Sequence, residues 1–387
     1  PRPLLPLFAS GELPPVDAVA ISYLADGLVP FTGRTRDAIR REWFADGPAV
    51  TSVRETHLGR IGTIVIPAFT SELYADSARL TGLVVRAMAL AGQIGARTVS
   101  LTGLIPSATD YGAEVVRVAA GVSAPLPLVT TGHATTTSAV VAAVAGILDA
   151  VGRPLAGERV ACIGLGSIGL TALRLLLATQ PHPHHLLLCD VGERRAALEA
   201  LAEDLRRDLG FGGRLDVIES GADVPAQVYE ATLIVGATNV PNVVSVDRLR
   251  PGTLVVDDSA PHCFDEDAAN RRARRQRDIL LAEGGLLRSP RRILELVHAP
   301  PSRGGNGWTE AVLHGRRDPF EITGCVLSSL LSAAPSGLGR SVGRVGDALA
   351  REHFRALGEL GFAAARPQCA GRRFGPRAVE RFRDATR

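Results

Sequence analysis

The sequence predicts an α/β fold with a doubly wound parallel sheet, and three observations support this prediction. Short apolar runs typical of strands alternate with longer runs of helical periodicity along most of the 387 residues. One apolar run, residues 159–163, breaks directly into a turn with the glycine spacing GxGxxG at 164–169, and an apolar helical segment follows at 170–178. A second apolar run, 185–189, ends in Asp190. A chain of this length also predicts more than one core.

The glycine turn carries the clearest chemical signal. Gly164 permits a tight turn, Gly166 lets the backbone approach a pyrophosphate, and Gly169 lets the helix pack closely on the strand. Ser167 and Ile168 complete the turn, and the N-terminus of the following helix then faces the phosphate charge. We therefore predict a Rossmann dinucleotide-binding domain with these five residues as cofactor contacts.

The choice of cofactor depends on the end of the second strand. Asp190 lies 21 positions after Gly169, where an acidic residue accepts the hydroxyl groups of an adenosine ribose, as in NAD-binding proteins. Arg194 and Arg195 follow closely and could instead bind a ribose phosphate, so NADP stays open. We expect NAD, with Asp190 and Arg194 at the adenosine end.

Two later strands are expected to end beside the nicotinamide. Residues 232–237 precede Thr238 and Asn239, and residues 253–257 precede the loop DDSAPHC, which begins at Asp257 and contains Asp258. Ligands of doubly wound sheets lie at the carboxyl ends of the strands. We therefore expect Thr238, Asn239 and Asp258 to belong to the cofactor site.

The succession of elements predicts three parts. Residues 1–154 read as an α/β substrate domain, 155–297 as the Rossmann domain, and 298–387 as C-terminal helices after a Pro/Gly-rich linker. These helices have too little apolar surface to stand alone, so we expect them to pack back onto the first domain, with the substrate in a cleft between the first two. The predicted strands are 16–23, 50–58, 61–66, 98–101, 126–129, 215–219 and 279–282. The predicted helices are 34–43, 71–91, 113–120, 193–209, 322–331 and 342–360, and a further helix opens in the stretch 130–138 and runs to about residue 151.

Composition excludes some chemistries. All 43 basic residues are Arg, so no lysine Schiff base or lysine acid is available. The five cysteines are scattered without a CxxC pair or zinc-ligand spacing, which predicts reduced thiols and no metal site. The sequence contains no run of about eighteen uncharged apolar residues, so it predicts no membrane span. The proline-interrupted start reads as a loose arm and not as a signal peptide, so we expect a cytoplasmic protein.

Two arginine clusters, 271–277 and 372–383, stand out against a formal net charge of only +3. Such clusters are typical of solvated helix faces, and they also suit an anionic partner such as an acidic acyl carrier protein. Nucleic acid is not expected, because few aromatic residues accompany the charge.

Three side chains are catalytic candidates. His133 lies in the hydroxyl-rich turn TTGHATTTS at a helix start, where the helix dipole would keep its ring neutral and able to hydrogen-bond a carbonyl. The hydroxyls of Thr131, Thr135 and Thr136 in the same turn could polarise that carbonyl. Cys263 follows a strand that should end near the nicotinamide, and His262 beside it could hold or remove a proton.

Several segments together resemble the long-chain acyl-[acyl carrier protein] reductases of cyanobacteria. They are SLTGLIPSATDYG at 100–112, TTGHATTTSAV at 130–140, the glycine turn, VVDDSAP at 255–261 and LLAEGGLL at 280–287. The resemblance runs in register over about residues 16–367. It implies a nicotinamide-dependent reduction of an acyl thioester to an aldehyde, in which a cysteine first takes the acyl group.

The sequence departs from that family at the positions that matter for its chemistry. The family's nucleophilic cysteine follows its GG pair, where this chain has Arg288, Ser289 and Pro290. The family uses NADPH with an arginine where this chain has Asp190. Three functions remain open: reduction of a small-molecule or carrier-bound acyl substrate, with Cys263 as a relocated nucleophile or by direct hydride transfer; a dehydrogenase of a small alcohol, aldehyde, imine or amino acid; and a non-catalytic nucleotide-binding protein. The oligomeric state is not predicted.

Overall fold

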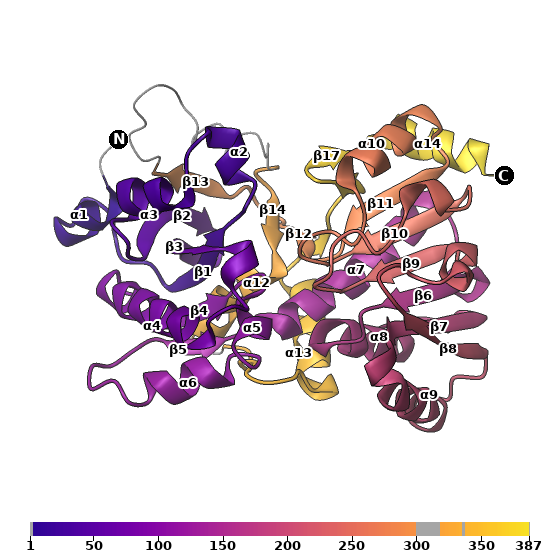
Figure 1. Ribbon diagram of the computed structural model, residues 1–387, viewed down its shortest axis with the longest axis horizontal. Coiled ribbons are helices and arrows are strands. Elements are labelled where there is room, and N and C mark those ends of the chain that lie inside the picture. Colours follow the sequence, from indigo (N-terminus) through magenta and orange to yellow (C-terminus); the bar gives the residue numbers. More distant parts are fainter. Residues whose placement is uncertain (1–2, 299–317, 335–336, 387) are drawn as a thin grey trace. The chain divides into compact units, whose positions relative to one another are not determined.

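A computed structural model describes residues 3–298, 318–334 and 337–386 of the chain, which divide into two compact units (Figure 1). Unit 1 consists of residues 1–133 and 289–344, and unit 2 of residues 134–288 and 345–387. This division differs from the expected boundaries at 154 and 297, because part of the C-terminal region belongs to each unit. Most of the Pro/Gly-rich linker lies outside the described residues.

Unit 1 is built on a six-stranded mixed sheet in the order β13-β2-β3-β1-β4-β5. Strands β3, β1, β4 and β5 run parallel; at one edge β2 pairs antiparallel with β3, and β13 pairs antiparallel with β2. Ile21 lies opposite both Ile64 and Leu101, so the centre of the sheet is apolar. The strands of this sheet are β1 Ala18–Leu24, β2 Ala49–Thr56, β3 Gly59–Phe69, β4 Thr98–Leu101, β5 Leu128–Thr130 and β13 Leu294–Val297. Strand β14, Glu321–Thr323, is not part of it.

Helices α4 and α12 pack against the central strands of this sheet. α12 is the first of the C-terminal helices, and its place on unit 1 matches the expectation that these helices return to the first domain. The chain start is not a loose arm, because Leu4 is buried within a short helix. The helices of unit 1 are α1 Leu4–Ala9, α2 Leu28–Thr32, α3 Arg36–Phe44, α4 Ser77–Gln93, α5 Ile105–Ala108, α6 Ala113–Ala119 and α12 Gly324–Ala333.

The expected helix start at Ser71 is wrong. Ser71 lies in a single 3₁₀ turn, and its hydroxyl and amide bond to Asp26 instead of capping a helix. Helix α4 begins six residues later at Ser77, where the side chain of Asp76 accepts a hydrogen bond from the Arg79 amide. Ser and Asp are both favoured N-cap residues, so the local sequence offered two starts.

Unit 2 has the strand order β11-β10-β9-β6-β7-β8, and all neighbouring strands run parallel. Numbered from β6, this is the 3-2-1-4-5-6 order of the doubly wound dinucleotide-binding fold, so the predicted fold class is confirmed. The direction of winding reverses between β6 and β9, the switch point at which such sheets bind ligands. The strands are β6 Arg159–Ile163, β7 His185–Val191, β8 Arg214–Ser220, β9 Leu233–Gly236, β10 Thr253–Asp257 and β11 Ile279–Glu283.

Residues 345–386 complete unit 2 and not unit 1, contrary to the sequence-based expectation. α13 packs on α8, and α14 packs on β11. Arg174 of α8 pairs with Asp347 of α13 at 2.8 Å, a contact that fixes this placement. The remaining elements are α8 Ser167–Thr179, α9 Arg195–Leu209, α10 Glu266–Arg275, β12 Leu286–Arg288, α13 Asp347–Glu359, β15 Ala363–Ala364, β16 Gln368–Cys369, β17 Arg372–Arg373 and α14 Pro376–Ala385.

Helix α7, His133–Val151, begins at the last residue of unit 1 and continues into unit 2. It is long and apolar enough to cross a bilayer, with a mean hydropathy of 1.6, but 72% of that stretch is buried inside the protein. Val140, Val144 and Ile147 contribute to the core of unit 2. Burial of this kind is typical of a core helix.

Candidate dinucleotide site

The three glycines of the turn between β6 and α8 each meet a different steric demand. Gly164 has a φ of 80°, and a Cβ there would lie 2.6 Å from the carbonyl oxygen of Ala237. A Cβ on Gly169 would lie 2.1 Å from the carbonyl oxygen of Gly164, so helix and strand approach as closely as backbone allows. A Cβ on Gly166 would meet nothing within 4 Å. The space over Gly166 is therefore a cradle that a side chain would begin to fill, as a pyrophosphate site requires.

The N-terminus of α8 follows this turn. Gly166 is the N-cap and offers no side-chain hydrogen bond to the first turn of the helix. Such an end presents backbone N–H groups and a partial positive charge to an anion. Ser167 and Ile168 supply amides here, but the Ser167 hydroxyl is buried and accepts a hydrogen bond from the Val345 amide at 3.3 Å. The predicted contact of Ser167 is thus limited to its backbone.

Asp190 lies at the end of β7, as predicted, and its carboxylate already accepts hydrogen bonds from within the protein. It accepts hydrogen bonds from the amide of Leu165 at 2.9 Å and from the Arg194 guanidinium at 2.6 Å. Arg195 pairs with Glu199 and Glu219. Both arginines that could receive a 2′-phosphate are therefore paired with carboxylates, which favours NAD over NADP.

The residues expected at the nicotinamide end follow β9 and β10. The Thr238 amide donates to the Ser259 hydroxyl at 3.0 Å, which ties the two loops together. Asn239 is exposed. Asp258 is partly buried beside a glycine pair, and a Cβ on Gly285 would lie 2.3 Å from its Oδ1. The glycine pair 284–285 thus leaves room for the Asp258 carboxyl.

Asp258 differs in protonation from an ordinary aspartate. Burial, with the nearby carboxylates of Asp257 and Glu283, raises its pKa well above the usual value. A carboxyl that keeps its proton near neutral pH can donate a hydrogen bond to a carbonyl or carboxamide oxygen.

His262 is the centre of a charged cluster at the ends of β10 and β11. Its Nδ1–H donates to Asp257 at 2.7 Å, and its Nε2 lies 3.4 Å from Glu283 and 3.8 Å from Glu266. Burial lowers the pKa of His262, but the hydrogen bonds to Asp257 and Glu283 outweigh it and raise the pKa to about 11. His262 therefore holds its proton near neutral pH, which argues against the expected role of removing a proton.

Cys263 is fully buried, and this argues against its predicted role as a nucleophile. Burial, followed by the charge of Asp257, raises the pKa of its thiol well above the ordinary value. A nucleophilic cysteine needs an accessible thiolate. The sulfur of Cys263 is buried, and its raised pKa disfavours the thiolate. Cys162, Cys189 and Cys369 are buried as well, the last of them in β16. Cys325, in α12 of unit 1, is partly exposed.

The hydroxyl-rich turn before α7 mostly bonds within the protein. Thr131 bonds Ser341 at 2.8 Å, and Thr135 bonds His353 at 2.9 Å, so neither hydroxyl is offered to a carbonyl. Thr136 has a buried hydroxyl without a hydrogen-bond partner in the described part of the chain. His133 is buried, and burial lowers its pKa to about 4. The ring is neutral as predicted, but the cause is desolvation.

Sequence reasoning missed Asp257, Glu283 and the packing role of the glycine pair. Asp257 and Glu283 end neighbouring strands in register, and only the sheet order shows that both face one histidine. Acidic residues at the ends of two apolar runs were the available signal. Among the described residues, no group of three or more His, Cys, Asp and Glu has a geometry that could hold a metal ion.

Fold and site define a two-unit α/β protein whose unit 2 has the dinucleotide-binding fold. No family model matches the sequence, and no curated protein matches it. Among solved structures, the chain is similar to L-tryptophan dehydrogenase from Nostoc punctiforme, with 15% identity over 69% of this chain and 70% of that chain and a TM-score of 0.37.

Two further solved structures show the same kind of likeness. Delta(1)-pyrroline-2-carboxylate reductase from Thermococcus litoralis, in complex with NADH and L-proline, has 17% identity over 59% of this chain and 67% of that chain, with a TM-score of 0.28. Shikimate 5-dehydrogenase from Listeria monocytogenes, in complex with shikimate and NAD, has 11% identity over 69% of this chain and 86% of that chain, with a TM-score of 0.29. These likenesses are distant and do not decide what this chain binds, which must follow from its own residues.

Proposed function

We propose that the chain is an NAD(P)-dependent oxidoreductase that transfers a hydride directly at a carbonyl carbon, with NAD as the favoured cofactor. The observation that carries the proposal is the open cradle over Gly166, at the N-terminus of α8 and at the switch point of the sheet. Asp190 at the end of β7 supplies the acidic group for the adenosine ribose. Bound at this site, the nicotinamide supplies or accepts the hydride.

Residues of this chain would bind the cofactor and supply the proton that accompanies hydride transfer. The amides at the start of α8 face the pyrophosphate, and Thr238 with Asn239 follows the strand beside the switch point. Asp258, whose pKa is raised by burial and by the carboxylates of Asp257 and Glu283, is the proposed proton donor to an oxygen. Because Cys263 is buried, the proposal contains no covalent acyl intermediate.

The decisive experiment has two measurements. Titration of the intact protein with NADH and NADPH tests the site, and we expect tighter binding of NADH. Mass spectrometry after incubation with acyl thioesters, without nicotinamide, tests the covalent route in the wild type and in Cys263→Ala. We expect no acyl adduct, together with NADH oxidation on aldehydes, ketones or imines. An adduct that disappears in Cys263→Ala would restore a covalent mechanism, and cofactor binding without any turnover would leave a nucleotide-binding protein.

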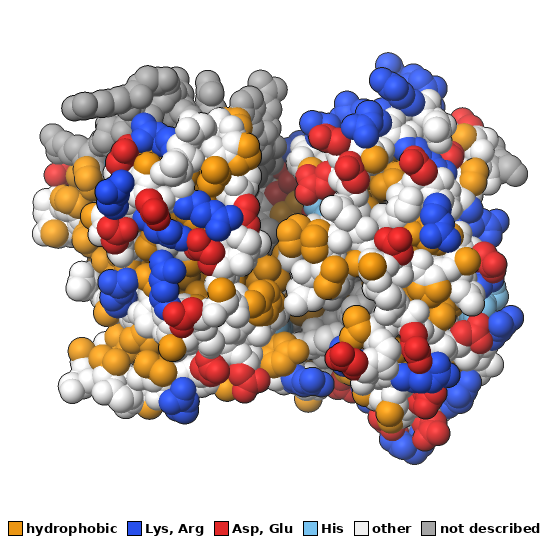
Figure 2. Space-filling model, viewed as in Figure 1, with side chains coloured by type: hydrophobic (Ala, Val, Ile, Leu, Met, Phe, Trp, Pro, Cys, Tyr) orange, Lys and Arg blue, Asp and Glu red, His pale blue; other side chains and the backbone are white. Residues whose placement is uncertain are grey.

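An acyl substrate on an acidic carrier protein is the second candidate, and one surface favours it. The hairpin β16–β17 packs on α10 and β11, and α14 packs on β11, so the two arginine clusters share one part of unit 2 (Figures 1 and 2). Arg272 does not belong to this surface, because it is buried and paired with Asp278. The exposed members are Arg271, Arg274, Arg275, Arg277, Arg372, Arg373, Arg377, Arg381 and Arg383.

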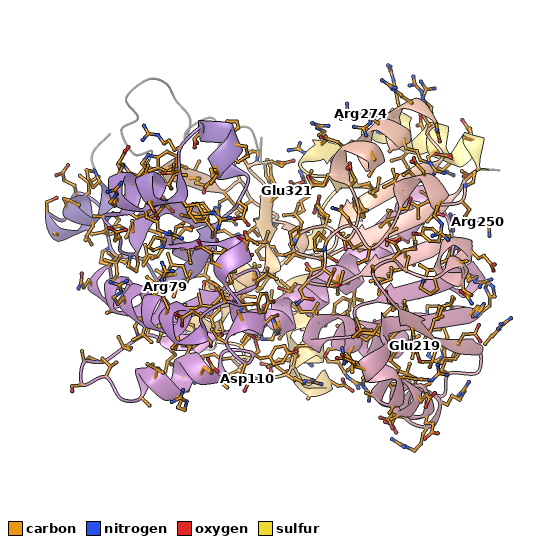
Figure 3. All side chains as sticks on the ribbon, in the orientation of Figure 1. Arg79, Asp110, Glu219, Arg250, Arg274 and Glu321 are labelled. Carbon is orange, nitrogen blue, oxygen red and sulfur yellow. The ribbon has the colours of Figure 1, made fainter. Side chains whose placement is uncertain are left out.

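Charge reversal at this surface tests whether an acidic carrier protein docks there. Arg274, labelled in Figure 3, and Arg275 lie on the exposed side of α10. We expect Arg274→Glu with Arg275→Glu to raise KM for a carrier-bound thioester about tenfold and to leave a free thioester analogue unchanged. Arg206→Glu, an exposed arginine on α9, is the matched control. An equal loss on both substrates would exclude carrier docking here.

A further inference from the structure

A second candidate site lies in unit 1, apart from the residues of the dinucleotide site. A cavity of about 360 Å³ opens between α3, the end of β3 and α4. Its lining includes Arg40, Arg79 and Arg86, and Asp46 is its acidic member. The excess of guanidinium groups suits an anion, and a volume of this size suits a small ligand.

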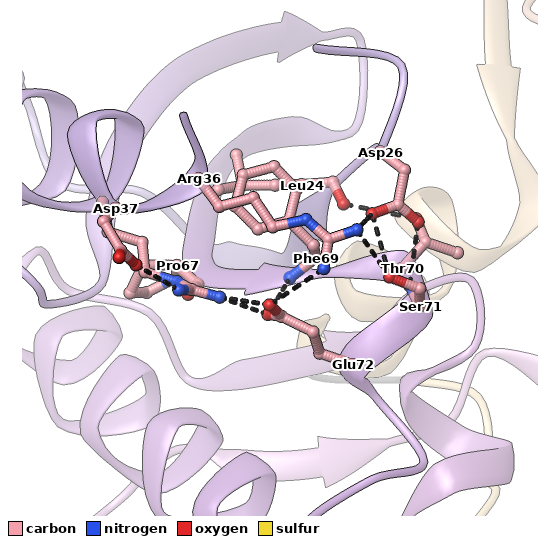
Figure 4. Close-up of polar contacts among 10 residues, drawn as sticks. Leu24, Asp26, Arg36, Asp37, Pro67, Phe69, Thr70, Ser71 and Glu72 are labelled. Atoms are coloured by element: carbon pink, nitrogen blue, oxygen red, sulfur yellow. Dashed lines mark hydrogen bonds and ion pairs between the residues drawn. The ribbon is translucent and has the colours of Figure 1, made fainter. Parts of the chain in front are cut away.

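Arg40 is a rigid wall of this cavity. Its guanidinium bonds to Glu72, to Asp37 at 2.9 Å and to the Pro67 carbonyl at 3.3 Å, and it stacks over the ring of Phe69. Figure 4 labels these four partners. Glu72 in turn accepts hydrogen bonds from Arg36 and from the Phe69 amide. A network of this kind leaves little freedom to the Arg40 side chain, so the wall is formed before any ligand arrives.

Arg79 and Arg86 differ from Arg40 because their side chains have no hydrogen-bond or ion-pair partner among the described residues. Both are exposed on α4, and Figure 3 labels Arg79. Seven residues place them on one helix face, about 10 Å apart along the axis. Two flexible guanidinium groups on one side of the cavity can therefore converge on one multiply charged ligand.

Gly82 lies midway between these two arginines. A glycine in the middle of a helix costs about 1 kcal/mol relative to alanine, so its presence needs a reason. A Cβ on Gly82 would meet nothing within 4 Å, and its backbone is helical, so neither packing nor a turn requires it. Its effect is to keep the floor of the cavity open between the two arginines.

We propose that this cavity binds a small phosphate-bearing anion, with Arg79 and Arg86 as the charged contacts and Gly82 as the open floor. Guanidinium groups match the oxygen geometry of phosphate. Arg40 is already paired with Glu72 and Asp37, so Arg79 and Arg86 supply the positive charge that is available to an anion. The inference goes beyond the proposed redox function, because it concerns other residues in the other unit.

Calorimetric titration of the full chain with pyrophosphate and with inorganic phosphate tests the proposal. We expect Gly82→Gln, which fills the floor, and Arg79→Gln with Arg86→Gln to weaken pyrophosphate binding at least tenfold. Arg117→Gln, an exposed arginine on α6 in the same unit, should bind as the wild type does. The melting temperature of Gly82→Gln should not fall, because the substitution favours the helix.

Three outcomes would overturn the proposal. The first is the absence of binding of either phosphate probe to the wild type. The second is unchanged pyrophosphate binding in Gly82→Gln, which would place the anion elsewhere, for instance at the α8 turn. The third is an affinity for citrate equal to that for pyrophosphate, which would show that the cavity attracts any multiply charged anion and does not select phosphate. NADH titration of Gly82→Gln separates the two sites, because cofactor binding should be unchanged whatever the phosphate result.

Discussion

Substitution of Gly169 by alanine is expected to abolish measurable NADH binding, with a loss of at least a hundredfold in affinity. The new Cβ would lie 2.1 Å from the carbonyl oxygen of Gly164, and a contact with backbone cannot be relieved by a rotamer change. Helix α8 must therefore move away from β6, and the amides at its start would leave the position that faces the pyrophosphate. Fluorescence titration with NADH measures the loss, and thermal unfolding measures the accompanying loss of stability.

Two other glycines of unit 2 serve as matched variants. Gly166→Ala adds a Cβ into open space, so we expect an unchanged melting temperature but weaker NADH binding, because the methyl group enters the cradle. Gly212→Ala also adds a Cβ into open space, in the loop before β8, and should change neither quantity. NADH binding to Gly169→Ala with wild-type affinity would show that the turn is not the cofactor site.

Substitution of His262 by glutamine is expected to cost about 3 kcal/mol or more of the free energy of unfolding. The side chain is 15% exposed and its partner Asp257 is 1% exposed, so the variant leaves a buried carboxylate without its cation. Removing one partner of a buried pair typically costs about 3–5 kcal/mol. Adding Asp257→Asn should recover part of the loss, because the most deeply buried of the carboxylates around His262 then carries no charge.

The pH dependence of this loss identifies its cause. The pKa of His262 is raised in the folded state from 6.5 to about 11, so the histidine contributes stability that is fully present below pH 6.5. That contribution falls as pH rises toward 11, where the folded state also loses the proton. The difference in unfolding free energy between wild type and His262→Gln should therefore shrink steadily between these values. A difference that stays constant with pH would assign the loss to packing, including the stacking on Phe264.

The sequence predicted the core strands well because their ends are marked locally. Residues 98–101 and 253–257 are apolar runs bounded by turn residues, and the structure has strands at those positions. The roles of Gly164 and Gly169 followed from spacing alone, and their geometry in the structure agrees with them. The approach of the Gly166 backbone to a pyrophosphate stays a prediction. These features depend on neighbours in sequence.

Features that depend on distant residues were not predictable. Whether a helix of modest apolar content packs on one sheet or another is decided by partners far away, as the pairing of Arg174 with Asp347 shows. Cys263 and Cys369 are buried, and His262 is held in its charged form by carboxylates, where separate strands end side by side. No pattern within a single segment contains that information.

The interleaving of the two units sets an order for their assembly during synthesis. Unit 1 closes one edge of its sheet with β13, and α12 covers its central strands, and both are made only after residues 134–288 of unit 2. Unit 2 in turn lacks α13 and α14 until residues 345–385 have been made. Each unit therefore reaches its final core only after its later segment has been made, and apolar sheet surface stays exposed until then.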